Sequence, residues 1–321
     1  IIIREYKTYY AMLKAMEKKQ EIEELSDSET LILEYLSKTI LSGVRPQELE
    51  LLKMLLEHNE VSIEEFQEDV SVEFGYLLDM NAIKNTIRIL LGHFHINSAE
   101  HQKYAQIDIL KVNENKRIQR LNSFVSKLNE SEFRKELNDI ISFGLHRYKD
   151  KYNQNKNQGV PFVLYEQYSR RDICFLMNCE KDLSSVMYGM KRIEDDVFIF
   201  VTYHKKQTKD ASKKYVDGKP DYDDRFESNQ IFCWDTQLGK GINSSYSQSV
   251  ITASRKHLMV QKRDRQIKFY YLGQFDILEV KPAKKLNQKG KEQDIAKFRV
   301  KMRNPVREDI WQYFLSNVDE E

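Results

Sequence analysis

The chain has 321 residues, of which 40% are hydrophobic and 31% are charged, and its formal net charge is +1. This composition is typical of a folded protein and excludes an intrinsically disordered chain. The first ten residues, IIIREYKTYY, hold an apolar run too short to span a membrane and lack the basic start of a signal peptide, so no membrane partner is expected. Because the chain begins with Ile1, we expect it to be a fragment of a larger protein.

The near-zero net charge hides an asymmetry between the two halves of the chain. Residues 1–150 hold 20 Lys and Arg against 26 Asp and Glu, whereas residues 151–321 hold 31 against 24. The first half is therefore acidic, at −6, and the second half is basic, at +7. A positive excess suits a polyanionic partner such as DNA, so we expect the second half to carry any nucleic-acid binding.

Residues 1–150 are predicted to form a helical bundle. The segment SDSETLILEYLSKTILSGV begins with a Ser/Asp cap and continues with apolar residues at three- and four-residue spacing. The same amphipathic pattern returns in RPQELELLKMLLEH, SIEEFQEDV, NAIKNTIRILLGHF and SEFRKELNDIISFGLHRYKDKY. We interpret the leucine-rich stripes as core, with a partner-binding surface as the alternative.

Histidines and cysteines are the candidate metal ligands. The spacing of His93, His95 and His101 would suit a metal on an extended segment, but no Cys or Asp set lies near them in the sequence. Cys174, Cys179 and Cys233 form no CxxC pair, so neither a zinc site nor a secreted disulfide framework is expected. We expect Cys174 to be a buried thiol, no metal or cofactor to be bound, and the protein to be cytoplasmic.

A change of pattern follows residue 150. Residues 151–160, rich in Asn, Gln, Lys and Gly, have no periodicity and are predicted to be a linker. Residues 161–321 open with a short helix, SRRDICFLMNC, for which Ser169 is the candidate N-cap and Asp172 lies in the first turn. Strands are predicted at DVFIFVTYH, NQIFCWDT, KHLMVQKR, IKFYYLGQFDILEV and IAKFRVKM, before a last helix, REDIWQYFLSN. The predicted fold class is α+β, a helical bundle followed by a mainly β, closed or nearly closed barrel with flanking helices.

The second half carries a resemblance to a known family. The segments LYEQYSRRDICFLMN, VFIFVTYHK, YDDRF, IFCW and FYYLGQF, in this order, resemble the C-terminal region of SauUSI-like type IV (modification-dependent) restriction enzymes. Those enzymes join a phospholipase-D-type nuclease and a helicase to a DNA-recognition module. The resemblance covers roughly residues 160–318, and the helical half more loosely.

The resemblance implies an SRA-like domain at residues 161–321. Such a domain would bind duplex DNA that contains 5-methylcytosine or 5-hydroxymethylcytosine and would extrude the modified base into a pocket. The bundle at residues 1–150 would couple it to the nuclease and helicase domains of the same parent chain. This fragment itself would then be a recognition module and not an enzyme.

A pocket for an extruded pyrimidine needs aromatic faces, an acceptor for the exocyclic amine and an apolar wall for the methyl group. These residue types gather between the second-half strands, where Asp224 is the preferred acceptor and Asp223 the second choice. The alternative is that the aromatic residues are core and that Asp224 serves a turn or a salt bridge. The candidate pocket residues are Tyr203, Tyr222, Asp223, Asp224, Phe226 and Trp234.

Basic residues near this segment suit contacts with DNA phosphates, with a solvated loop as the alternative. The candidate backbone contacts are Lys205, Lys206, Lys213, Lys214, Arg225 and Lys240.

Catalytic motifs are incomplete. HKKQTKD, from His204 to Asp210, approaches the phospholipase-D motif H-x-K-x-x-x-x-D, but only three residues separate Lys206 from Asp210 and no second copy is present. The sequence also has no phosphate-binding loop of the form G-x-x-x-x-G-K-[ST]. No catalytic residue is therefore expected. A different class of function stays open, namely a protein-interaction or assembly domain of a DNA-processing helicase with only nonspecific DNA binding.

Overall fold

The structure is a computed structural model of the 321-residue chain. It describes residues 5–16, 24–153, 160–204, 215–216, 219–220, 222–263, 266–287 and 289–316, without the side chains of 204, 215–216 and 219–220. Within these ranges, no helix has the length and apolar character needed to cross a membrane.

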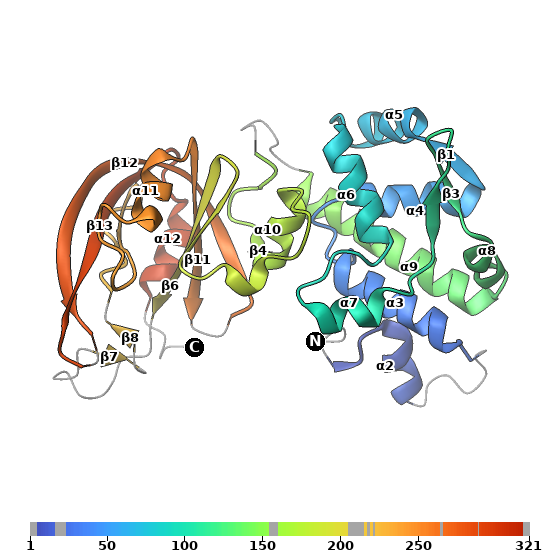
Figure 1. The fold of residues 1–321 in the computed structure, drawn as a ribbon, viewed down its shortest axis with the longest axis horizontal. Helices are drawn as coiled ribbons and strands as arrows, with labels where there is room; N and C mark the ends of the chain where they lie inside the picture. The colour runs from blue at the N-terminus through green and yellow to red at the C-terminus, as the bar shows by residue number, and fades with distance from the viewer. Residues whose placement is uncertain are drawn as a thin grey trace. The chain divides into compact units, whose positions relative to one another are not determined.

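Contacts within the chain divide it into two units. The first comprises Ile1–Pro161 and Cys174–Leu183, and the second comprises Phe162–Ile173 and Ser184–Glu321. The first unit is mainly helical and the second is built on a sheet (Figure 1). The predicted α+β class, with a helical region before a sheet region, is confirmed.

The first unit is built from capped helices and one small sheet. Ser26 and Glu29 form a capping box at the start of α3, and Ser62 and Glu65 form another at the start of α5. Its elements are α2 (Tyr9–Ala15), α3 (Asp27–Thr39), α4 (Gln47–Glu57), β1 (Glu60–Ser62), α5 (Ile63–Phe74), α6 (Met80–Leu90), α7 (Ser98–Tyr104), β2 (Leu110–Val112), β3 (Arg117–Arg120), α8 (Asn122–Leu128), α9 (Ser131–Arg147) and the π-helix η1 (Tyr148–Tyr152). The three short strands pair in the order β1-β3-β2, which the all-helical expectation for this half had missed.

Helix α4 forms the centre of this unit. Leu49, Leu52 and Leu55 have no exposed surface, as a core helix requires. Helix α9 packs closely on it because Gly144 leaves room for Leu49: a Cβ added at Gly144 would lie 2.7 Å from Leu49 Cδ1. The leucine-rich stripes are therefore core.

A buried arginine holds the segment Cys174–Leu183 in the first unit. Arg45 is 7% exposed and forms an ion pair with Glu48, which is 2% exposed. The Arg45 guanidinium also donates to the backbone oxygen of Phe175 at 2.6 Å and to Asn178 Oδ1 at 2.7 Å. Because a guanidinium carries five donors in a fixed fork, one side chain can bond several groups at once.

The second unit begins as the sequence predicted. Ser169 Oγ accepts from the backbone nitrogen of Asp172 at 3.1 Å, and the Asp172 carboxylate accepts from the nitrogen of Ser169 at 2.8 Å, so the predicted cap is confirmed. The elements are β4 (Gln167–Ser169), α10 (Arg170–Leu176), the 3-10 helix η3 (Ser184–Val186), β5 (Met190–Ile193), β6 (Asp196–His204), β7 (Tyr215–Val216), β8 (Lys219–Pro220), β9 (Arg225–Phe226), β10 (Ile231–Asp235), α11 (Ser245–Thr252), β11 (Arg255–Arg263), β12 (Lys268–Leu286), β13 (Glu292–Met302) and α12 (Glu308–Leu315).

Strand β12 belongs to both halves of the main sheet. Its first part pairs with β11 and β4, and its second part, from Phe275 to Leu286, pairs with β13. Irregular register near Leu258 and Ile277 and a positive φ of 106° at Gly273 accompany this change of partner. Figure 1 shows β12 and β13 as long, strongly curved strands.

The main sheet is open in the described residues, so of the closed or nearly closed barrel that was predicted, the closed form is wrong. The strand order is β5-β6-β11-β12-β13-β10-β9, with β4 beside β12. Its two edges are β5 and β9, which are short, and each pairs with one neighbour in this order. Periodicity identifies strands but does not decide whether edge strands meet, because closure depends on strand tilt and register.

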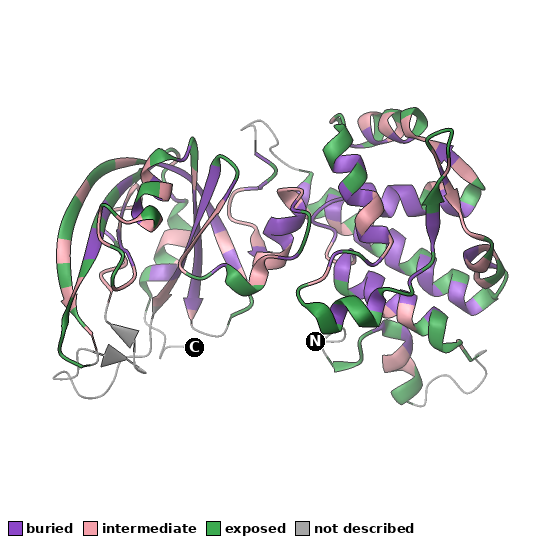
Figure 2. Cartoon of the chain, in the orientation of Figure 1, coloured by how far each residue is buried: buried purple, intermediate pink, exposed green. Residues whose placement is uncertain are grey.

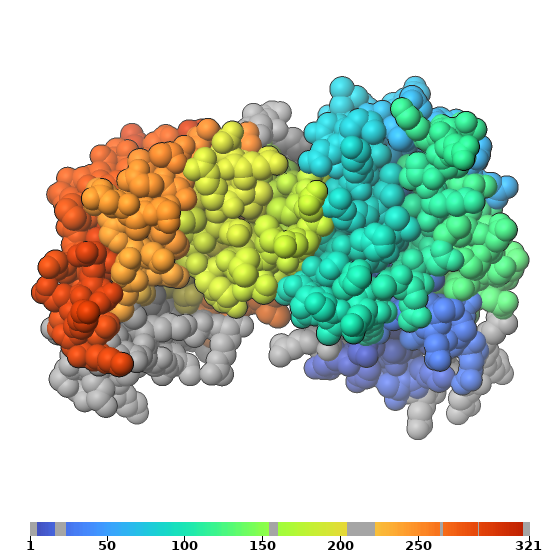
Figure 3. All heavy atoms as spheres, in the orientation of Figure 1, coloured from blue at the N-terminus to red at the C-terminus, as the bar shows by residue number. Residues whose placement is uncertain are grey.

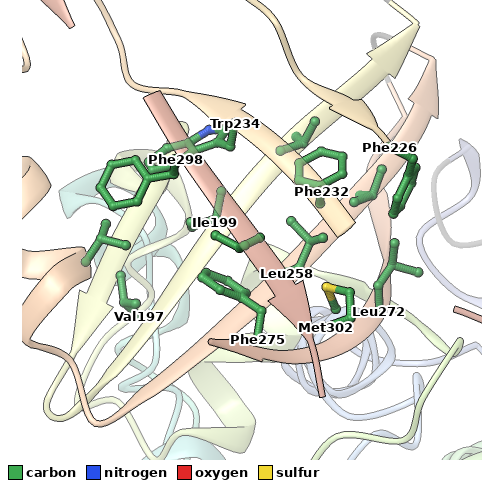
Figure 4. Packing of buried hydrophobic residues seen from close by; sticks show 14 of the residues in the cluster. Val197, Ile199, Phe226, Phe232, Trp234, Leu258, Leu272, Phe275, Phe298 and Met302 are labelled. Carbon is green, nitrogen blue, oxygen red and sulfur yellow. The ribbon is translucent and has the colours of Figure 1, made fainter. Parts of the chain in front are cut away.

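The core lies between the two parts of this bent sheet. Ile199 of β6, Phe298 of β13 and Phe232 of β10 are each at most 2% exposed, and they converge in Figure 4. Val250 of α11 and Phe314 of α12 belong to the same cluster, so these helices cover it. Burial of this apolar surface is what holds the bend of β12 in place.

Candidate nucleic-acid interface

The described residues include part of the predicted site. Tyr203, Tyr222, Asp223, Asp224 and Phe226 lie at the end of β6 and at the start of β9, and Trp234 lies on β10. The predicted phosphate contacts Lys205, Lys206, Lys213 and Lys214 and the side chain of His204 lie outside the described residues.

Tyr203 and Phe226 form one aromatic cluster. Their ring centroids are 5.6 Å apart, and the ring of Phe314 lies 5.9 Å from Tyr203. Phe226 is only 8% exposed, because it packs against Phe232 at 4.8 Å. Burial raises the pKa of Tyr203, which keeps its hydroxyl neutral. This cluster is therefore part of the hydrophobic core that α12 covers.

Trp234 contacts a different set of rings. It is 4% exposed, and its ring centroid lies 5.2 Å from Phe298 and 6.3 Å from Tyr246. The structure thus assigns Trp234 and the Tyr203–Phe226 pair to one continuous core without bringing them into a single open aromatic face.

The polar residues of the predicted site gather around a buried carboxylate, Asp235. Asp235 is 5% exposed and accepts from the backbone nitrogen of Asp223 at 2.9 Å. Asp224 Oδ1 in turn accepts from the backbone nitrogen of Asp235 at 3.1 Å. The hydroxyl of Tyr222 accepts from the nitrogen of Leu238 at 3.1 Å, which joins the same segment to the turn after β10.

Lysines of β12 and β13 balance this carboxylate. Lys285 Nζ lies 2.8 Å from Asp235 Oδ2, and Lys297 Nζ lies 3.9 Å from Asp235 Oδ1. The sequence reasoning did not single out Asp235, although IFCWDT places it at the strand end. Its carboxylate pairs with Lys285, which is fifty residues further along the chain. No local pattern could have indicated that partner.

Asp223 is also held in its charged form. Its ion pair with Arg225 lowers the pKa of Asp223, and Lys297, 3.7 Å away, acts in the same direction. Asp223, Asp224 and Asp235 therefore form an acidic group that adjoins the basic strands β12 and β13.

Register places basic side chains on the outer face of these strands. Lys297 pairs with Asp235 and Lys281, Arg299 pairs with Cys233, and Lys301 pairs with Ile231. Lys297, Arg299 and Lys301 are exposed, whereas Phe298, Val300 and Met302 between them are buried. Alternation along β13 thus separates a basic face from the core face. Glu227 neutralises part of this face through an ion pair of 2.7 Å with Arg299.

Beyond the sheet, β12 and β13 continue as a two-stranded ribbon. The pairs run from Pro282↔Ala296 to Leu286↔Glu292. Figure 2 shows that much of the outer part of both strands is exposed or intermediate. In Figure 3 the orange and red spheres, which are the residues near the C-terminal end of the sequence, form part of the molecular surface. Residues 279–303 hold nine Lys and Arg against three Asp and Glu. We call residues 279–303 the basic ribbon; they comprise this two-stranded part and the adjoining parts of β12 and β13 that pair within the sheet.

The tip of the basic ribbon is a structured turn. Asn287 Oδ1 accepts from the backbone nitrogens of Lys289 and Lys291, both at 3.0 Å, and Gly290 has a positive φ of 72°. The side chains of Lys289 and Lys291 are exposed. Lys240, a predicted phosphate contact, is exposed beside this ribbon, where it forms a bridge to Ile295. The sequence reasoning missed the ribbon lysines.

The candidate metal ligands His93, His95 and His101 belong to the first unit and are distant in sequence from the basic ribbon. The rings of His95 and His101 are 4.4 Å apart. Across the described ranges, no group of three or more His, Cys, Asp and Glu side chains is placed to hold a metal ion.

Two family models match the chain, and each is described as a domain of unknown function. DUF8090 matches residues 1–153 and DUF3427 matches residues 162–314. No curated protein matches the sequence.

Solved structures show a weak likeness. The sulfur binding domain and SRA domain of ScoMcrA, complexed with phosphorothioated DNA, is 10% identical with a TM-score of 0.27, over 88% of this chain and 97% of that chain. SUVH6 of Arabidopsis thaliana, in complex with SAM, is 10% identical with a TM-score of 0.30, over 54% and 33%. KRYPTONITE, in complex with mCHG DNA and SAH, is 10% identical with a TM-score of 0.28, over 58% and 41%. This chain thus spans a third of the SUVH6 chain. At these TM-scores the superpositions assign neither a ligand nor a site to it.

Proposed function

We propose that this chain is the DNA-recognition part of a modification-dependent restriction enzyme and that its sheet unit binds duplex DNA. The observation that carries the proposal is the basic ribbon, which has exposed lysines along its strands and at its tip. Each base pair of duplex DNA carries two phosphate charges, so a basic surface gains affinity by releasing condensed counterions.

The shape of the basic ribbon supports the same proposal. The major groove of B-DNA is about 12 Å wide and admits a two-stranded β-ribbon. Pairing from Pro282↔Ala296 to the turn at Gly290 gives a narrow element with lysines at its end. Lys289 and Lys291 would contact phosphates at the groove edges.

The finer part of the proposal concerns the modified base. We propose that the segment Tyr222–Asp224 forms the rim of a pocket for extruded 5-methylcytosine or 5-hydroxymethylcytosine, with Asp224 or Asp223 accepting from the exocyclic amine. Support comes from the family resemblance and from the position of these carboxylates against the basic strands. The buried rings of Phe226 and Trp234 would support this rim from the core. Stacking would then fall to Tyr222 or to Tyr203, which is half-buried against Phe226.

The first unit would then be the coupling bundle, and the helicase and phospholipase-D-type nuclease of the same parent chain would be its partners. The predicted division into residues 1–150, a linker at 151–160 and 161–321 stays part of this proposal. This chain would carry no catalysis of its own.

A second candidate function, a protein-interaction domain, is favoured by one feature of the helical unit. A groove of about 1090 Å³ lies among α2, α3 and α9, and its lining includes Tyr9, Leu33, Leu41 and Phe143. Tyr9 and Phe143 are 48% and 52% exposed. Exposed apolar patches of this kind can accept another protein segment.

A single binding experiment separates the two functions. The whole chain would be titrated with duplexes of one sequence that carry cytosine, 5-methylcytosine or 5-hydroxymethylcytosine, at several salt concentrations. We expect affinity to fall steeply with salt for all three, because phosphate contacts dominate, and to be highest for a modified duplex. Binding without any preference would favour the nonspecific alternative, and absence of binding would exclude the proposed function.

A further inference from the structure

Arg170, at the start of α10, lies among aromatic rings of the sheet unit. Its guanidinium carbon is 4.8 Å from the ring centroid of Phe269, 5.2 Å from that of Tyr188 and 5.5 Å from that of Phe200. Phe269 and Phe200 are buried, so they form the floor beneath the guanidinium. Tyr188 is 62% exposed and leaves this site open to solvent.

The charge of Arg170 has no carboxylate partner among the described residues. Its Nε atom is buried and has no hydrogen-bond partner there. Six other arginines of the same unit are ion-paired to acidic residues, namely Arg192, Arg225, Arg255, Arg299, Arg303 and Arg307. Asp172, the acidic residue closest in sequence, accepts from the backbone of Ser169. Arg170 therefore differs from these arginines in having a charge that no acidic side chain balances.

Such an arrangement is unfavourable unless something else uses the donors. Arg170 is half-buried, and a buried Nε–H that lacks an acceptor loses hydration that cation–π contacts replace only in part. Burial lowers the pKa of Arg170, and the opposing contribution comes from Tyr188 and not from a carboxylate. Because arginine remains protonated at neutral pH, the site keeps a positive charge with unused donors.

We propose that Arg170 and Tyr188 form a binding site for a phosphate group. The planar guanidinium fork matches two phosphate oxygens, and an exposed tyrosine ring beside it can stack on a base. If the proposed function holds, the phosphate belongs to the DNA backbone, and the site adds a contact that is remote in sequence from the basic ribbon. The same chemistry would accept a free phosphate anion, and the experiment distinguishes the two sources.

The direct test observes the Nε–Hε resonance of Arg170 by ¹⁵N–¹H correlation spectroscopy of the whole chain. Titrations would use a plain DNA duplex in one series and inorganic phosphate in another. We expect the Arg170 resonance to shift and saturate with the duplex, and to return as salt is raised. A shift with phosphate alone, in a protein that binds no duplex, would support the site while excluding the proposed function. An Arg170 resonance unmoved by both ligands would overturn the site, whether or not the protein binds DNA through other residues.

Variants give an independent measure. R170M keeps an apolar stem over the rings, and R170K keeps the charge but loses the fork. For R170M we expect the slope of log affinity against log salt to flatten by about 0.9, the value for one phosphate contact. R170K should keep most of this slope and bind more weakly than the wild type.

The matched control is R307M. Arg307 also lies over a tyrosine ring, 4.9 Å from that of Tyr165, but it is paired with Asp309 at 2.6 Å. We expect R307M to leave both the affinity and the salt slope unchanged. Equal effects of R170M and R307M would overturn the proposal, and should R170M not fold, R170K and the resonance titration decide.

Discussion

His257 and Asp196 are joined inside the sheet unit by a hydrogen bond of 2.7 Å between Nε2 of the imidazole and Oδ1 of the carboxylate. His257 has no exposed surface, and its other ring nitrogen, Nδ1, lies 3.1 Å from the hydroxyl of Tyr271. Asp196 also accepts two hydrogen bonds from Arg255, at 2.7 and 2.6 Å. This buried network links the parallel strands β6 and β11.

The network predicts a loss of stability in acid. Burial lowers the pKa of His257, although Asp196 opposes this effect. Below pH 6.5, the ordinary pKa of histidine, the unfolded chain therefore binds more protons than the folded chain. Burial acts to raise the pKa of Asp196, but hydrogen bonds from Arg255 and His257 outweigh it and hold the value at about 2. The fold is therefore more stable at neutral pH than in acid. The contribution of His257 to the free energy of unfolding is lost as pH falls below 6.5, and that of Asp196 is lost as pH falls below 3.8.

Urea unfolding at a series of pH values measures this effect. We expect the free energy of unfolding to decrease from pH 7.5 to pH 5 in the wild type. H257Q keeps a donor for Asp196 but does not titrate, so its stability should change less over that range. The change that remains would come from groups such as His93, whose pKa is also lowered by burial. At lower pH, below 3.8, loss of the Asp196 contribution should lower the free energy of unfolding by a further amount on the order of 2 kcal/mol. An unchanged slope in H257Q would show that other groups control the pH dependence.

The basic ribbon predicts an affinity for duplex DNA that does not depend on the base sequence or its modification. The double variant K289A/K291A should weaken plain and methylated duplexes by similar factors and flatten the salt slope by up to about 1.8, or about 0.9 for each phosphate left without its lysine. Fluorescence anisotropy at several salt concentrations would measure it. Lys53, which pairs with Glu50 in the helical unit, offers a control, since K53A should not alter binding. A weakening restricted to the methylated duplex would place the tip lysines at the base instead.

The predicted phosphate contacts that lie outside the described residues allow the same test. Replacing Lys205, Lys206, Lys213 and Lys214 by alanine should also weaken methylated and plain duplexes alike, if these residues bind phosphates.

Two variants separate the structural role of Asp224 from its proposed contact with the base. D224A removes the acceptor of the Asp235 backbone N–H and should lower stability by about 0.5–1.5 kcal/mol. If Asp224 also accepts from an extruded cytosine, D224A should weaken modified DNA by a further ~1–3 kcal/mol. D224N keeps an acceptor oxygen for Asp235, so a selective loss of modified-DNA binding with normal stability would indicate the base contact. Full retention of the preference in a folded D224A variant would exclude Asp224 and direct attention to Asp223.

Arg45 should be critical for the helical unit. R45M leaves Glu48, which is 2% exposed, without its cation, and it also removes the bonds to Phe175 and Asn178. Breaking one side of a buried ion pair costs about 3–5 kcal/mol. Thermal and urea unfolding would measure the decrease in stability. R147M is the control, because Arg147 donates to the backbone oxygen of Ser42 without a carboxylate partner in the described residues. A small effect of R45M would mean that the segment Cys174–Leu183 is held mainly by apolar packing.

The extent of the strands shows where sequence reasoning stopped. The pattern IKFYYLGQFDILEV predicted a strand that ends at Val280, whereas β12 continues to Leu286. Residues such as Lys281 and Lys284 are exposed on both sides of the ribbon, and a period of two appears in a sequence only when one face is buried. Residues 281–294 of the basic ribbon were therefore not identified from hydrophobic periodicity, although their lysines are evident in the sequence.

The sequence by itself determined the local features of this protein. Caps such as that of Ser169 and Asp172, the amphipathic helices and most strands depend on residues a few positions apart in the sequence. The charge difference between the halves follows directly from their composition. Only the tertiary structure decided that the sheet is open, that Asp235 is buried beside Lys285 and that Arg170 lies over three rings without a carboxylate among the described residues. These relationships join positions far apart in the chain, and their energies come from burial and Coulomb interactions that exist only after strands such as β12 have paired.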